Sequence, residues 1–226
     1  MNRLTPGLNA LILSFAVFLT AFSTSAPAEA TKIGVKDGTS LNFTVMREGE
    51  EIGSHVIKFS RAGDRVGVEI KTDVEVTVLF VPVYHFNHQG REVWQNGKLT
   101  MLVSSTDDDG TKHNLTVKGE AATLNINGDG RSSTVPSGII PASLWHPDLA
   151  RPGKTSILNT LDGHRMNINT TFIKEEKVMV GSTEVMAKHF NIAGGLERDV
   201  WYGPDGTLVK VGFKGSDGSD IEYVLK

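Results

Sequence analysis

The chain has 226 residues, a formal net charge of −3 and no cysteine. The absence of cysteine excludes disulfide bonds, thiolate nucleophiles, thiolate-ligated zinc and lipid attachment at a cysteine. Because lysine and arginine form no run or stripe, the sequence also argues against a nucleic-acid partner.

Residues 1–30 have the organisation of a secretory signal peptide. Arg3 precedes an uncharged apolar stretch, LNALILSFAVFLTAF, over residues 8–22. This stretch is too short to cross a membrane, and the small residues after it offer cleavage after Ala28 or Ala30. We therefore expect a periplasmic protein that is not an integral membrane protein after cleavage. An uncleaved N-terminal anchor is the alternative.

The remainder, residues 31–226, is expected to form a single β-rich domain. Its clearest strand is RVGVEIKTDVEVTV, where every second residue is apolar except Thr72: Val66, Val68, Ile70, Thr72, Val74, Val76 and Val78. A period of two indicates an antiparallel strand with one buried face. The strand is longer than the usual ~5–6 residues, which favours a curved sheet or partial barrel.

Glycine-containing turns separate the alternating segments along the chain. They are REGEEIG after residue 46, Asn96–Gly97, Asp107–Gly110, Asn127–Gly130, Asp162–Gly163, Gly203–Gly206 and Ser216–Gly218. Such turns predict an all-β antiparallel meander of roughly twelve to fourteen strands. One short helix, PASLWHPDL, is predicted near residues 141–149. It separates two β-rich halves, residues 41–135 and 155–226.

The stretch VTVLFVPVYHF, residues 76–86, departs from alternation because both of its faces are apolar. Pro82 has no N–H group to donate to a neighbouring strand. Two interpretations are open. Either Leu144 and Trp145 of the short helix cover the stretch, or it lines an apolar cavity or a partner surface.

The phrase Arg–acid–Val–Trp occurs twice, at residues 91–94 and 198–201, and His-Phe-Asn precedes both copies. The turns after each tryptophan predict a register for both hairpins. This register pairs Glu92 with Met101, Trp94 with Leu99, Asp199 with Val211 and Trp201 with Val209. It places acid and tryptophan on the apolar side in both copies. An internal duplication and a coincidence of hairpin sequences both explain the repeat.

Glu92 and Asp199 have three interpretations. A carboxylate that faces a core needs a partner, so each acid is expected to anchor its hairpin through an arginine or a histidine. The alternatives are ligand contact and general acid–base catalysis.

Metal and nucleophile signatures are weak. His85 and His88 lie on opposite sides of a regular strand, so a metal site would need a bulge and a third ligand from His113 or His146. No HExxH motif occurs, and no strand–turn–helix carries a GxSxG serine. We therefore predict no catalytic residue, metal or cofactor.

Three segments carry a resemblance to a known family: REGEEIGSHVIKF, TLDGHRMNINTTF and VWYGPDGTLVKVGFKGSDGSDIEYVL. From Leu41 onward the chain resembles exported bacterial β-rich proteins known only as domains of unknown function. The resemblance implies an antiparallel β architecture and a periplasmic location, and it brings no established active site. A similarity to the half-barrel lipoprotein carriers of the periplasm is architectural analogy alone.

Together these features predict a non-enzymatic binding or carrier module for an apolar or lipid-like small molecule. The expected contacts are Phe80, Val83, Tyr84, Phe86, Glu92, Trp94, Trp145, Asp199 and Trp201. One alternative is a structural factor of the cell envelope that binds a partner protein through an exposed edge strand. Another is a hydrolase that uses Glu92 and Asp199.

Overall fold

The computed structural model describes residues 36–226, and the predicted signal peptide lies outside this range. One sheet of 15 strands is built from these residues. The strands are β1 (Ser40–Arg47), β2 (Glu50–Ala62), β3 (Arg65–Val78), β4 (Val81–Gln95), β5 (Lys98–Asp108), β6 (Thr111–Glu120), β7 (Thr123–Gly128), β8 (Arg131–Pro136), β9 (Ile140–Pro141), β10 (Gly153–Leu158), β11 (Arg165–Val180), β12 (Thr183–Gly194), β13 (Arg198–Tyr202), β14 (Leu208–Lys214) and β15 (Asp220–Leu225).

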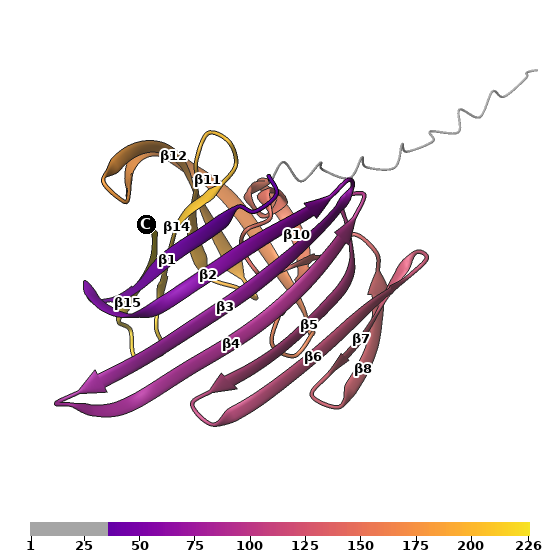
Figure 1. The fold of residues 1–226 in the computed structure, drawn as a ribbon, viewed down its shortest axis with the longest axis horizontal. Coiled ribbons are helices and arrows are strands. Elements are labelled where there is room, and N and C mark those ends of the chain that lie inside the picture. Colours follow the sequence, from indigo (N-terminus) through magenta and orange to yellow (C-terminus); the bar gives the residue numbers. More distant parts are fainter. Residues whose placement is uncertain (1–35) are drawn as a thin grey trace, which may run out of the picture.

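The sheet follows the chain as a meander, and its order runs from β8 down to β1, then from β15 down to β9. The first and last strands, β1 and β15, therefore pair in the middle of the sheet. Strands β8 and β9 are the free edges, so the curved sheet stays open and forms the trough seen in Figure 1. The predicted all-β antiparallel curved sheet is confirmed. The short β9–β10 pairing is parallel.

The core lies on the concave face of this trough. Alternate residues of β2 to β7 point into it, among them Ile57, Val68, Trp94, Leu102, Val117 and Ile126. Two segments between β8 and β11 fill part of the concave side. Trp145 packs between Phe59 and Trp94, at ring distances of 5.2 and 5.5 Å. Ser104 donates a hydrogen bond to the Thr160 carbonyl oxygen at 2.5 Å.

The predicted glycine turns all lie between strands. Asn96 and Gly97 have φ of 51° and 72°, as expected for a tight hairpin. The predicted helix is shorter than expected. It is the four-residue 3-10 helix η1 (Pro147–Ala150), while residues 140–141 form β9. Pro147 explains the late start, because the residue before a proline is disfavoured in helical conformation and His146 is extended.

The β3–β4 hairpin extends beyond its neighbours as an arm. Strand β2 stops pairing with β3 at Val74, and β5 stops pairing with β4 at Phe86. Residues 75–84, here called the apolar arm, project past the sheet (Figure 1). At its tip Leu79 and Phe80 are 87% and 98% exposed. The interpretation that Leu144 and Trp145 cover this stretch is therefore wrong.

Candidate functional site

A cavity of about 420 Å³ opens on the concave face of the trough. Its floor comes from β2–β4 and β13–β15, and its rim from residues 142–144, 159–161 and 195–198. Much of the lining is apolar and includes Ile70, Phe86, Leu161, Leu196, Val211 and Phe213. The polar side chains in it include His55, Thr72, His88, Arg198 and Tyr223. An apolar cavity with a few polar groups is typical of a small-molecule site.

A row of alternating histidine and threonine side chains crosses five strands, and the first three of these residues line the cavity. His55 on β2 is opposite Thr72 on β3, and Thr72 is opposite His88 on β4. His88 is in turn opposite Thr106 on β5, which is opposite His113 on β6. We call these residues the His–Thr row. Side chains that are opposed in this way share one face of a sheet.

Hydrogen bonds fix the orientation of two of these rings. His55 Nδ1 lies 2.7 Å from the Thr72 hydroxyl oxygen, and His88 Nδ1 lies 2.7 Å from that of Thr106. Because Nδ1 is engaged, Nε2 is the ring nitrogen that can hydrogen-bond to a bound molecule.

Burial keeps both rings uncharged. It lowers the pKa of His55 to about 3, with a smaller contribution from the nearby His88, and it lowers the pKa of His88 to about 4. Both histidines are therefore neutral at pH 7, since the ordinary histidine value is 6.5. This wall of the cavity offers hydrogen bonds without charge.

The adjoining wall is aromatic and carries a cation. Tyr223 packs against His55 at a ring distance of 5.1 Å and against Phe213 at 5.8 Å. The Arg198 guanidinium lies 3.8 Å from the centre of the Phe213 ring. Burial raises the pKa of Tyr223 and lowers the pKa of Arg198. The cavity therefore combines a neutral polar wall with a positively charged one.

Glu92 belongs to a separate buried cluster next to the cavity. Its Oε2 atom accepts hydrogen bonds from the indole N–H groups of Trp94, at 2.8 Å, and Trp145, at 3.1 Å. Burial raises the pKa of Glu92, and the Trp94, Trp145 and Ser143 groups oppose this shift. Its Oε1 and the Ser143 hydroxyl oxygen are buried, and within residues 36–226 neither has a hydrogen-bond partner other than the other. The carboxyl thus anchors the segment that contains Trp145, through tryptophans rather than an arginine or histidine.

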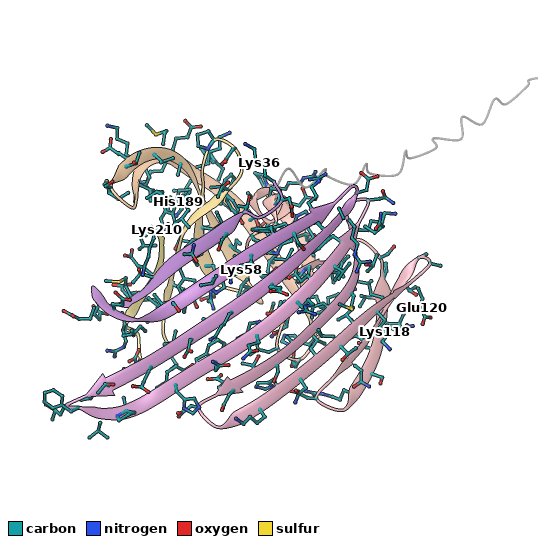
Figure 2. The ribbon with its side chains drawn as sticks, in the orientation of Figure 1. Lys36, Lys58, Lys118, Glu120, His189 and Lys210 are labelled. Carbon is teal, nitrogen blue, oxygen red and sulfur yellow. The ribbon has the colours of Figure 1, made fainter. Side chains whose placement is uncertain are left out.

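The register predicted for the second tryptophan hairpin is wrong. A bulge after Trp201 pairs it with Lys210, and pairs Asp199 with Gly212. The acid and the tryptophan therefore lie opposite the core face occupied by Val200. There His189 lies 2.8 Å from Asp199 and stacks on Trp201 at 4.2 Å. His189 and Lys210 mark this flank in Figure 2.

The first hairpin keeps its predicted side, although its register also shifts. Trp94 pairs with Leu99 as expected, but a bulge pairs Glu92 with Leu102 instead of Met101. Glu92 is 1% exposed on the concave side, whereas Asp199 lies on the other face of the sheet. The structure does not bring these two carboxyl groups together, as a shared acid–base site would require.

The predicted ligand contacts fall into four places. Phe86 lines the cavity, while Glu92, Trp94 and Trp145 form the adjacent cluster. Phe80, Val83 and Tyr84 lie on the apolar arm or at its base, and Tyr84 donates a hydrogen bond to Asp108 at 2.8 Å. Asp199 and Trp201 lie on the opposite face.

Sequence reasoning missed most of the polar cavity lining. Thr72 was visible as a polar residue within an apolar strand face, and His55 alternates with Ile57 and Phe59 in the same way. A polar residue on an otherwise apolar face is the signal that marks these positions. Arg198 was considered only as a partner for Asp199.

A second hollow of the described structure is a weaker candidate for a ligand site. It is larger, about 1160 Å³, and lies along β6–β8, but exposed lysine, asparagine, threonine and serine side chains dominate its lining. In the described part of the chain, no group of three histidine or acidic side chains could hold a metal ion. No helix within residues 36–226 is long and apolar enough to span a membrane.

Comparison with known proteins places the chain in a family without adding an activity. A search of the curated proteins found no match. Residues 43–226, which include all the cavity-lining residues named above, match a family described as a domain of unknown function, DUF6134. Since this match covers most of the sequence, the chain belongs to the DUF6134 family.

Proposed function

We propose that the protein is a non-enzymatic binding or carrier module that holds an apolar or lipid-like ligand in the concave cavity. The observation that carries the proposal is the cavity of about 420 Å³, whose lining is more apolar than polar. Its volume falls within the range of about 300–1,000 Å³ that is usual for small-molecule pockets. The neutral rings of His55 and His88, together with Thr72, supply hydrogen bonds that can orient a ligand.

The place of action that we propose is the periplasm. The support is the N-terminal sequence, where a basic residue, an apolar stretch and small residues follow one another as in a signal peptide. A carrier in this compartment would shield apolar molecules from water between membranes. Mass spectrometry of the protein isolated from cells tests the export step, because cleavage after Ala28 or Ala30 gives a defined mass.

Ligand binding is tested with delipidated protein and a series of fatty acids and lipids. We expect a rise in the melting temperature that saturates with ligand, because a ligand that binds only the folded state stabilises it. The variant Leu161→Trp fills part of the cavity and should abolish this rise. Its matched control is Val103→Trp, which adds the same side chain at an exposed position of β5. Absence of any shift in the unmodified protein would contradict the proposal.

A second candidate function is a cell-envelope interaction factor, and the apolar arm favours it. Two neighbouring large apolar side chains, Leu79 and Phe80, are almost fully exposed at the arm's tip, which is costly unless a partner covers them. Replacing both with serine should remove the partner but leave ligand binding in the cavity intact. This function would be favoured over the first if the wild-type protein retained a stable protein partner, the serine variant did not, and neither held a small molecule.

A further inference from the structure

Arg198 is a cation on the wall of the concave cavity, and no carboxylate within residues 36–226 pairs with it. Its Nη1 donates one hydrogen bond, to the Glu197 carbonyl oxygen at 2.7 Å, and its guanidinium stacks on Phe213. No salt bridge joins it to a carboxylate anywhere in residues 36–226. A guanidinium has five N–H donors, so most of its hydrogen-bonding capacity is unused.

Two other arginines of the same protein are paired with carboxylates, unlike Arg198. Arg47 is partly buried and Arg91 is exposed, and each forms a salt bridge, to Asp217 at 2.6 Å and to Glu69 at 2.8 Å. Withdrawing a cation from water without a partner is costly, so buried charges are normally paired. Arg198 is partly buried too, and unlike these two arginines it has no carboxylate partner within residues 36–226.

The surroundings of Arg198 suit an anionic group with two adjacent oxygen atoms. The Phe213 ring holds one face of the guanidinium, so its edge is free for two parallel hydrogen bonds to a carboxylate or phosphate. Tyr223 and His55 follow along the wall and are neutral hydrogen-bonding groups. Beyond them the lining is apolar, with Ile70 and Phe86. The cavity is thus charged at one place and apolar away from it.

We propose that the cavity selects amphiphiles with an anionic oxygen head group, a carboxylate or phosphate, and that Arg198 binds this head group. The inference rests on the proposed function, since it names the ligand class of the same cavity. Glu197 is the opposing charge: it lines the cavity and favours the protonated state of Arg198 without a salt bridge. Its side chain is exposed, so it weakens the site without blocking it.

Competition against a neutral fluorescent probe, N-phenylnaphthylamine, tests the inference on the delipidated protein. The competitors share one alkyl chain and differ in head group: palmitic acid, hexadecyl phosphate, hexadecanol and hexadecyltrimethylammonium, all below their micelle concentrations. We expect the two anions to compete about tenfold or more better than the alcohol, from the strength of hydrogen bonds to charged groups.

Substitutions test whether Arg198 causes the preference for anionic head groups. Arg198→Gln should remove the preference for anions but keep competition by the alcohol, and Arg198→Lys should keep part of it. Glu197→Gln should increase the affinity for both anions. Arg91→Gln removes the same charge from the exposed outer surface and should change nothing. Circular dichroism and thermal unfolding establish that each variant is folded.

The outcomes separate the two proposals. Equal competition by all four compounds in the wild type would overturn the head-group inference and leave the carrier function standing. An anion preference that persists in Arg198→Gln would overturn the role of Arg198. If the probe binds and none of the compounds displaces it, or if the probe itself does not bind, the carrier function fails as well.

Discussion

Replacing Glu92 with leucine should destabilise the protein by about 2–6 kcal/mol, because two buried donors would lose their acceptor at a cost of about 1–3 kcal/mol each. The donors are the indole N–H groups of Trp94 and Trp145, which share the Glu92 Oε2 atom. Trp145 is 3% exposed, so water cannot replace the lost hydrogen bond. Leucine removes the acceptor and keeps an apolar side chain of similar size.

The variant Glu92→Gln separates the hydrogen bonds from the charge. Its amide oxygen can accept from both indoles, so at acidic pH we expect stability within about 1 kcal/mol of wild type. Burial raises the pKa of Glu92 above its ordinary value of 4.5, so folding favours the protonated carboxyl. That contribution is complete below pH 4.5 and is lost as the pH rises through the raised pKa. Glu92→Gln should therefore become more stable than wild type as the pH increases.

Urea unfolding followed by tryptophan fluorescence measures both effects at a series of pH values. Thermal unfolding followed by circular dichroism provides a second probe, because the substitutions lie beside the fluorophores. A Glu92→Leu variant within about 1 kcal/mol of wild type would refute the anchoring role, since even one orphaned buried donor costs about that much. A stability difference between wild type and Glu92→Gln that does not change with pH would refute the raised pKa.

Three further changes test other parts of the fold. The pKa values of His55 and His88 are held at about 3 and about 4, so wild type should lose stability as the pH falls from 6.5 towards 4. The double variant His55→Gln/His88→Gln should lose less stability over this pH range, as measured by urea unfolding. An equal loss in the variant and in wild type would contradict this prediction. Leu79 and Phe80 have φ of 50° and 67°, so an Asn-Gly pair there should raise the free energy of unfolding by about 1–2 kcal/mol. A β-carbon at Gly128 would lie 1.8 Å from the Asp162 carbonyl oxygen, so Gly128→Ala should lower the melting temperature, and an unchanged value would contradict that contact.

The fold class was predictable because its signals are local. Alternation over residues 65–78 and the Asn-Gly and Asp-Gly pairs depend on a few neighbouring residues, and the structure has strands and turns at those places. The turn at Leu79 and Phe80 was not predictable, because neither residue favours positive φ. Without a turn signal there, the stretch could not be recognised as an arm.

The faces of the two tryptophan hairpins show where local reasoning fails. Both hairpins carry a bulge beside the tryptophan, and a bulge shifts the pairing by one residue. In the first hairpin Trp94 stays in the core, but in the second Trp201 lies on the opposite face. The repeated phrases are not placed equivalently either. His85–Asn87 and Trp94 lie on one strand, β4, whereas His189–Asn191 lies on β12 and Trp201 on β13.

The cavity escaped prediction because its two walls come from opposite ends of the chain. His55, Thr72 and His88 belong to β2–β4, whereas Arg198, Phe213 and Tyr223 belong to β13–β15. The pairing of β1 with β15 brings these groups together, and no local pattern encodes that pairing. The charged group of the cavity and its neutral histidine and threonine side chains therefore come from different parts of the sequence. A ligand that contacts both walls would also link the two ends of the sheet, so its binding should protect β1 and β15 from hydrogen exchange more than the edge strand β8.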